Sequence, residues 1–167
     1  MKRLPRFAIL AAILASAALP VRAEEITRVA SPNPAAPLAA VVIVPPGATT
    51  YYISGGLPDV ADPKAPKGTV EAYGDTAAQV ASILEKLKKT LAPLGLAPGD
   101  VVQARVFLLG DPAKNDAMDF AGLNAAWAKV FGTAEQPNKP ARTTVKAAGL
   151  VLPGALVEIE FVAAKVK

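Results

Sequence analysis

Charged and hydroxyl side chains alternate with apolar ones in residues 140–164, near the C-terminus. The pattern predicts two β-strands of one sheet, because residues two apart in a strand share a face. By that period Arg142 and Thr144 share one face of the first strand, and Glu158 and Glu160 share one face of the second. A guanidinium and a carboxylate on such short, stiff elements form either an ion pair on the sheet surface or the floor of a site.

The composition limits the chemistry that these residues could support. The chain has no histidine and no cysteine among its 167 residues. Histidine is the commonest general base near neutral pH and the commonest metal ligand, and cysteine supplies thiolate ligands and disulfides. Histidine-dependent hydrolases and zinc enzymes are therefore excluded, and no metal or cofactor is expected. The chemistry that remains must use carboxylates, arginine, lysine, hydroxyl groups or the backbone.

Residues 1–23 have the pattern of a secretory signal peptide. Three basic residues precede an apolar run from Phe7 to Leu19, and Val21 and Ala23 are small residues ahead of a cleavage point. The apolar run is shorter than the roughly 20 residues that span a bilayer. We therefore expect a periplasmic or secreted protein of residues 24–167, without a membrane association after cleavage.

Removing that segment changes the net charge. It holds four of the 18 Lys and Arg residues and none of the 14 Asp and Glu residues, so residues 24–167 carry 14 of each sign. A protein without net charge has no overall attraction for nucleic acid. We expect no nucleic-acid partner.

The order of the predicted elements defines a fold class. The patterns predict a strand at 26–30, a hairpin of 39–44 with 49–54, a loop at 57–74, a helix ending near 91, a central strand at 101–108 covered on both sides, a second helix ending at 132, and the two C-terminal strands around a turn at 152–154. Two helices are too few to cover both faces of a sheet. We therefore expect a single α+β domain with a mixed sheet and both helices on one face, and a closed homo-oligomer that covers the other face.

The two helices have identifiable starts and apolar stripes. Asp75 is the expected N-cap of the first helix, and Asn115 or Asp116 that of the second. Trp127 falls on the apolar stripe of the second helix, which is typical of a core residue. Asn124 lies beside that stripe, where taken alone it is an ordinary exposed amide.

These residues also carry a resemblance to a known family. The Pro-Ala-Arg of 140–142, the Leu-Pro of 152–153 and the Val-Glu-Ile-Glu of 157–160 resemble the C-terminal signature of the RidA/YjgF family, and the similarity extends upstream over most of residues 24–167. Members are small trimers, and many hydrolyse reactive enamines and imines. The resemblance implies a chorismate-mutase-like fold, a homotrimer with sites between subunits, and a small imine or enamine with a carboxylate as substrate.

The resemblance also assigns roles to particular residues. Arg142 matches the arginine that holds the substrate carboxylate, and Glu158 matches the glutamate associated with the hydrolytic water. Positions that line the cleft match Ser54, Gly55 and Asn124.

Two positions depart from the family pattern. A frequent cysteine is replaced by Thr144, which can donate or accept a hydrogen bond in its place, and a site tyrosine is replaced by Leu38. The expected function is hydrolytic deamination of a 2-imino acid, and the alternative is a non-catalytic module that binds small carboxylates. The ribonuclease activity of some relatives is not favoured, because basic residues and aromatics do not form a groove pattern.

Overall fold

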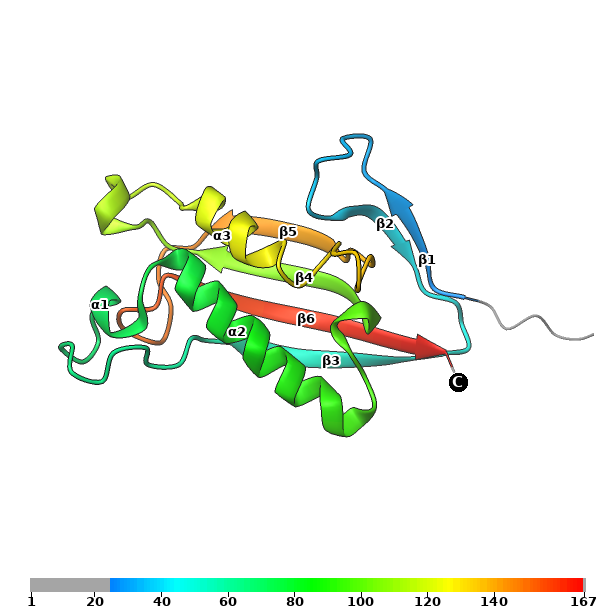
Figure 1. Ribbon diagram of the computed structural model, residues 1–167, viewed down its shortest axis with the longest axis horizontal. Helices are drawn as coiled ribbons and strands as arrows, with labels where there is room; N and C mark the ends of the chain where they lie inside the picture. The colour runs from blue at the N-terminus through cyan, green and yellow to red at the C-terminus, as the bar shows by residue number, and fades with distance from the viewer. Residues whose placement is uncertain (1–24, 167) are drawn as a thin grey trace, which may run out of the picture.

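A four-stranded mixed sheet forms the body of the protein in the computed structural model, which describes residues 25–166. The order across the sheet is β3-β6-β4-β5, with β4 and β5 parallel and the other pairs antiparallel. A separate antiparallel pair, β1 with β2, lies beyond the β5 side of the sheet (Figure 1). The strands are β1 (Thr27–Ala30), β2 (Ala39–Ile43), β3 (Ala48–Gly56), β4 (Val101–Leu108), β5 (Ala141–Lys146) and β6 (Val157–Val166). The predicted signal peptide, residues 1–23, lies outside the described residues and stays a prediction.

Both longer helices cover the same face of this sheet (Figure 1). They are α2 (Thr76–Leu91) and α3 (Phe120–Trp127), and a one-turn helix, α1 (Val70–Tyr73), lies in the segment that the sequence predicted to be all loop. The α+β architecture with helices on one face is confirmed. No helix of residues 25–166 is long and apolar enough to cross a membrane.

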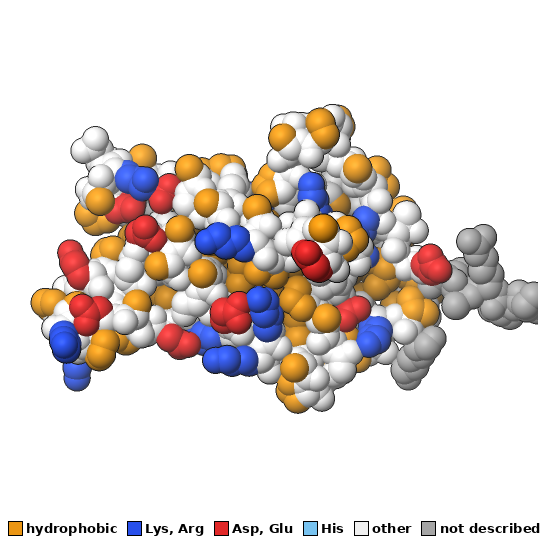
Figure 2. Space-filling view, in the orientation of Figure 1, with side chains coloured by type: hydrophobic (Ala, Val, Ile, Leu, Met, Phe, Trp, Pro, Cys, Tyr) orange, Lys and Arg blue, Asp and Glu red, His pale blue; other side chains and the backbone are white. Residues whose placement is uncertain are grey.

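Alternation along β6 builds the core. Val157, Ile159, Phe161 and Ala163 point toward the helices and are at most 2% exposed, as their period predicts. The apolar stripe of α2 packs on them, while its charged side chains of both signs face solvent (Figure 2). Trp127 of α3 is fully buried, and the centroid of its ring lies 4.5 Å from that of Phe131. It is the core residue that the sequence indicated.

The first helix begins as predicted. The Asp75 carboxylate accepts a hydrogen bond from the Ala78 amide at 2.8 Å and caps α2. Inside the same turn, the buried Gln79 amide donates to the Gly74 and Gly154 carbonyls and accepts from the Leu156 amide. Gln79 thus ties the start of α2 to the chain that enters β6.

We expect Asp75→Ala to lower the free energy of unfolding by about 1 kcal/mol, since it removes one N-cap hydrogen bond. Chemical denaturation of the purified protein measures this change. Asp59→Ala is the matched control, because Asp59 forms only an exposed ion pair with Lys86. Equal destabilisation by both substitutions would contradict the capping role.

The predicted pairing of the strand at 39–44 with that at 49–54 is wrong. The turn between them forms, with the Ala48 amide donating to the Pro45 carbonyl at 3.1 Å. However, β2 pairs with β1, and among the described strands β3 pairs with β6 alone. Pro45 lacks an amide donor at the position next to the turn, and the Ala39 amide donates to Pro140, which holds β2 near β5 instead.

Two further predictions need correction. The second helix is capped by Asp119, whose carboxylate accepts from the Gly122 amide, and not by Asn115 or Asp116. Those two residues have φ of 54° and 61°, a left-handed conformation that an N-cap does not adopt. The central strand β4 is covered by helices on one face only within the described chain, since Arg105 on the other face is exposed.

Candidate functional site

Arg142 lies on the helix-covered face of the sheet, at its β5 edge. It pairs with Ala104 of β4, which is buried beneath the helices, so the two side chains share that face. Thr144 pairs with the buried Val106 and shares the face too. The arginine, the hydroxyl and the adjacent helix α3 therefore form one group.

The Arg142 guanidinium is held on one side only. Its Nη2 donates to Asn124 Oδ1 of α3 at 2.7 Å. Its Nε and Nη1 are buried, and neither has a hydrogen-bond partner among residues 25–166. Burial lowers the pKa of Arg142 to about 10, so the group keeps its charge at neutral pH. A half-buried cation with two nitrogens that lack acceptors is suited to a carboxylate, which accepts two parallel hydrogen bonds.

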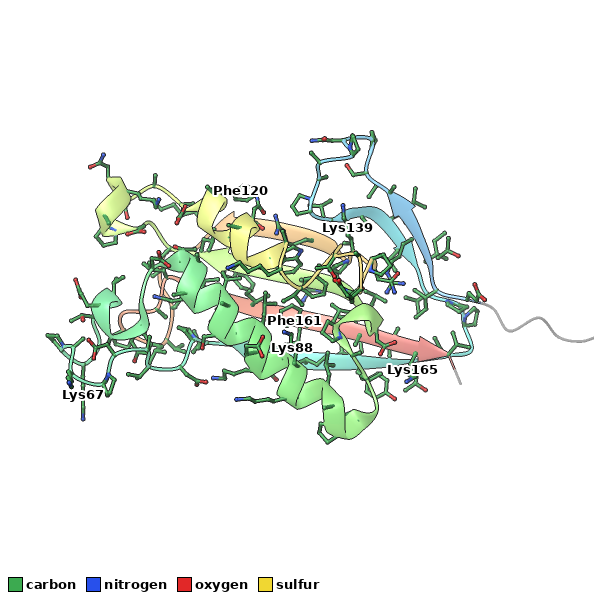
Figure 3. The ribbon with its side chains drawn as sticks, in the orientation of Figure 1. Lys67, Lys88, Phe120, Lys139, Phe161 and Lys165 are labelled. Atoms are coloured by element: carbon green, nitrogen blue, oxygen red, sulfur yellow. The ribbon has the colours of Figure 1, made fainter. Side chains whose placement is uncertain are left out.

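Two aromatic rings frame the same guanidinium. Its central carbon lies 4.9 Å from the centroid of a Trp127 ring and 5.6 Å from that of Phe120. Phe120 is 47% exposed and lies at the start of α3 (Figure 3). Such contacts stabilise the cation without using its donors. From the sequence alone Phe120 is expected on the apolar stripe of the second helix, and its contact with Arg142 was not predicted. Its place in the first turn of the helix that carries Asn124 is the signal that could have identified it.

Glu158 lies on the other face of the sheet. It pairs with Phe107 of β4, one position out of phase with the buried Val106, so its side chain points away from the helices. The carboxylate lies against Gly55, where an added Cβ would overlap it. Ser54 immediately precedes Gly55 at the end of β3. Glu158, Ser54 and Gly55 thus form a second group.

The predicted site residues therefore fall into two sets within one chain. Arg142, Thr144 and Asn124 lie together at the β5 edge on the helix side. Glu158, Ser54 and Gly55 lie together across β3 and β6 on the open side. A surface ion pair does form on the open face of the sheet, but it joins Arg105 of β4 to Glu160 of β6 at 3.0 Å.

Leu38 precedes Ala39, whose amide donates to the Pro140 carbonyl at 3.0 Å, two residues before Arg142. It lines a cavity between β2 and residues 137–139, next to Pro37, whose carbonyl accepts from the Trp127 indole at 3.0 Å. Among the described residues, no group of three or more acidic, histidine or cysteine side chains converges as metal ligands do.

This mixed sheet with two helices on one face is the α+β fold of YjgF-like proteins. A solved structure from Yersinia pestis, described as a protein of unknown function of the conserved Rid protein family, superposes with a TM-score of 0.61 at 24% identity, over 84% of this chain and 98% of that one. The family model described as Endoribonuclease L-PSP matches residues 29–165. The chain belongs to this family, which includes the RidA/YjgF and RutC proteins.

Several curated relatives have deaminase names. The 3-aminoacrylate deaminase RutC of Acinetobacter baylyi is 34% identical over 127 residues, which cover 76% of this chain and 88% of the relative. The 2-iminobutanoate/2-iminopropanoate deaminase of Escherichia coli is 35% identical over 97 residues, which cover 58% of this chain and 70% of the relative. The chain is thus a distant homologue of enamine and imine deaminases.

Proposed function

We propose that the protein hydrolyses 2-imino acids or their enamine tautomers to 2-keto acids and ammonia. The observation that carries this proposal is the Arg142 guanidinium, with two buried nitrogens that lack acceptors in the described chain. A 2-imino acid supplies the missing acceptors through its carboxylate. The deaminase names of the relatives supply the reaction class.

The reaction needs little beyond position and a route for protons. Water adds to the imine carbon, the carbon–nitrogen bond then breaks, and the nitrogen leaves as ammonia after gaining protons. Arg142 fixes the reacting carbon by holding the carboxylate. Glu158 orients the water and accepts its proton, a form of help worth about 10²–10⁴-fold. Thr144 adds a hydrogen bond to the bound substrate from the same face as Arg142.

The Arg142 set and the Glu158 set lie on opposite faces of the sheet within one chain. The proposal therefore requires a site between subunits. In a closed ring, the β5 edge of one copy meets the open face of the next, so Arg142 of one subunit and Glu158 of another face the same substrate. A homotrimer gives three such sites. It also covers the open face of the sheet, where Tyr52 is 85% exposed.

Mixed oligomers provide the test of this arrangement. We expect Arg142→Ala and Glu158→Gln proteins to be inactive alone but to recover roughly a quarter of the parent activity when unfolded together and refolded, since random mixing pairs an intact Arg142 with an intact Glu158 at one interface in four. Ammonia release from a 2-imino acid, generated in situ by an amino-acid oxidase, measures the activity.

The parent and each variant refolded alone are the controls for that experiment. If the refolded parent regains activity and the refolded mixture does not, then either both residues act within one subunit or they do not share a site. A parent that never accelerates hydrolysis of small or bulky imino acids would overturn the deaminase proposal itself.

A binding module without turnover is the second candidate. Leu38 stands where the family has a site tyrosine, and it supplies no hydroxyl group at that position. Carboxylate binding without hydrolysis would favour this candidate. We do not propose a nuclease activity, because residues 24–167 carry equal numbers of acidic and basic residues.

A further inference from the structure

A second cationic cavity lies apart from both groups of site residues. It has a volume of about 240 Å³ and is enclosed by the β1–β2 pair on one side and the loop before β5 on the other. Its polar lining comes from Arg28, Ser31, Asn33, Asn138 and Lys139. Blue side chains are visible where the β1–β2 pair meets the body of the molecule in Figure 2, and Lys139 lies beside β2 in Figure 3.

Arg28 is the fixed cation of this cavity. Its Nη2 donates to the Gly99 carbonyl at 2.8 Å and to the Val101 carbonyl at 3.2 Å, which anchors β1 against the start of β4. Its Nε is buried and has no hydrogen-bond partner in the described part of the chain. Burial lowers the pKa of Arg28, and Asp100 opposes that shift. The Asp100 carboxylate itself accepts from the Ala97 amide in its own turn at 2.8 Å.

Lys139 supplies a second positive charge. Its ammonium donates to the Ala36 carbonyl at 2.9 Å, and within residues 25–166 its other two donors have no hydrogen-bond partner. Neither Lys139 nor Arg28 forms an ion pair with a described carboxylate, and no acidic side chain lines the cavity. Asp100 offsets part of the Arg28 charge but does not line the cavity, so the two cations that do line it still favour an anion placed between them.

We propose that this cavity binds a small oxyanion, a phosphate or a carboxylate, between Arg28 and Lys139. The oxyanion accepts a hydrogen bond from Arg28 Nε and others from the Lys139 ammonium, and the amides of Asn33 and Asn138 line the remaining wall. The volume exceeds the roughly 30 Å³ that one water occupies in the liquid, so an ion of four or five heavy atoms fits. The site is independent of the proposed deaminase reaction.

The test follows the side-chain Nε–H resonances of Arg28 and Arg142 in the full-length, nitrogen-15-labelled protein. Sodium phosphate is titrated in one series and sodium acetate in another, each at constant ionic strength. We expect a saturable shift of the Arg28 resonance in at least one series, and the series that produces it identifies the ligand class. The Arg142 resonance reports separately on the proposed substrate site.

Lys139→Gln removes one charge but keeps a donor for Ala36, so the fold should persist, and we expect about tenfold weaker binding. Lys67→Gln removes the same charge at the far end of the molecule from Lys139 (Figure 3) and should change nothing. A shift of Arg28 that never saturates, equal binding by Lys139→Gln and the parent, or shifts confined to Arg142 would each overturn the proposal.

Discussion

Replacing Arg142 by alanine is expected to lower kcat/KM for a 2-imino acid by about 10²–10⁴-fold. The substitution removes two charge-assisted hydrogen bonds to the substrate carboxylate, each worth about 1.5–3 kcal/mol. Each 1.4 kcal/mol corresponds to a factor of ten. The amino-acid oxidase assay, run at several substrate concentrations, measures the ratio.

Two further variants separate the role of Arg142 from a general loss of charge. Arg142→Lys keeps the charge but cannot form the planar pair of bonds, so its kcat/KM should fall between those of the parent and Arg142→Ala. Lys88→Ala removes an exposed cation that forms an ion pair with Glu85 and should leave the rate unchanged. Parental kcat/KM in Arg142→Ala would rule out the carboxylate cradle.

Replacing Glu158 by glutamine is expected to lower kcat by about 10²–10⁴-fold, with a smaller change in KM. The amide keeps the shape that fits against Gly55 but cannot accept the proton of the attacking water. Steady-state kinetics with the same oxidase assay separate the two constants. A change in KM alone would assign Glu158 to binding and not to the chemical step.

Glu160→Gln is the matched control for that substitution. Glu160 lies on the same face of β6, two residues further along, and pairs with the exposed Arg105. Loss of a surface ion pair costs about 0–1 kcal/mol in stability, so catalysis should be little affected. Equal losses in both variants would mean that negative charge on this face matters, and not the particular carboxylate of Glu158.

Local patterns in the sequence were sufficient to predict much of this fold. The apolar stripe of α2, its cap at Asp75 and the alternation of β6 are all confirmed. Each depends only on residues close together in the sequence, within one or two helical turns or two positions along a strand. The pairing of β2 was predicted wrongly because β1 and β3 both lie close to it in sequence. Pro45, which lacks an amide donor beside the turn, and the hydrogen bond from Ala39 to Pro140, which is distant in the sequence, distinguish the two partners.

The same holds for the candidate site: patterns within one strand were predictable, and the relation between distant strands was not. The two-residue alternation correctly placed Arg142 and Thr144 on one face of β5. It also correctly placed Glu158 and Ile159 on opposite faces of β6. It could not relate the two strands to each other, because β4 lies between them and its register decides which face each side chain occupies. The split of the six predicted residues into two sets is therefore a property of the assembled sheet.

The unpaired nitrogens of Arg142 have a consequence for how this sequence can change over time. Arg142 is half-buried, and a charge withdrawn from water without a counter-ion destabilises the folded chain, so an apolar residue of similar volume at such a position is often neutral or stabilising. Selection for stability alone would therefore remove Arg142, whereas selection for ligand binding retains it. A lineage that stops using the ligand should lose this arginine early, while the buried face of β6 and the stripe of α2 persist.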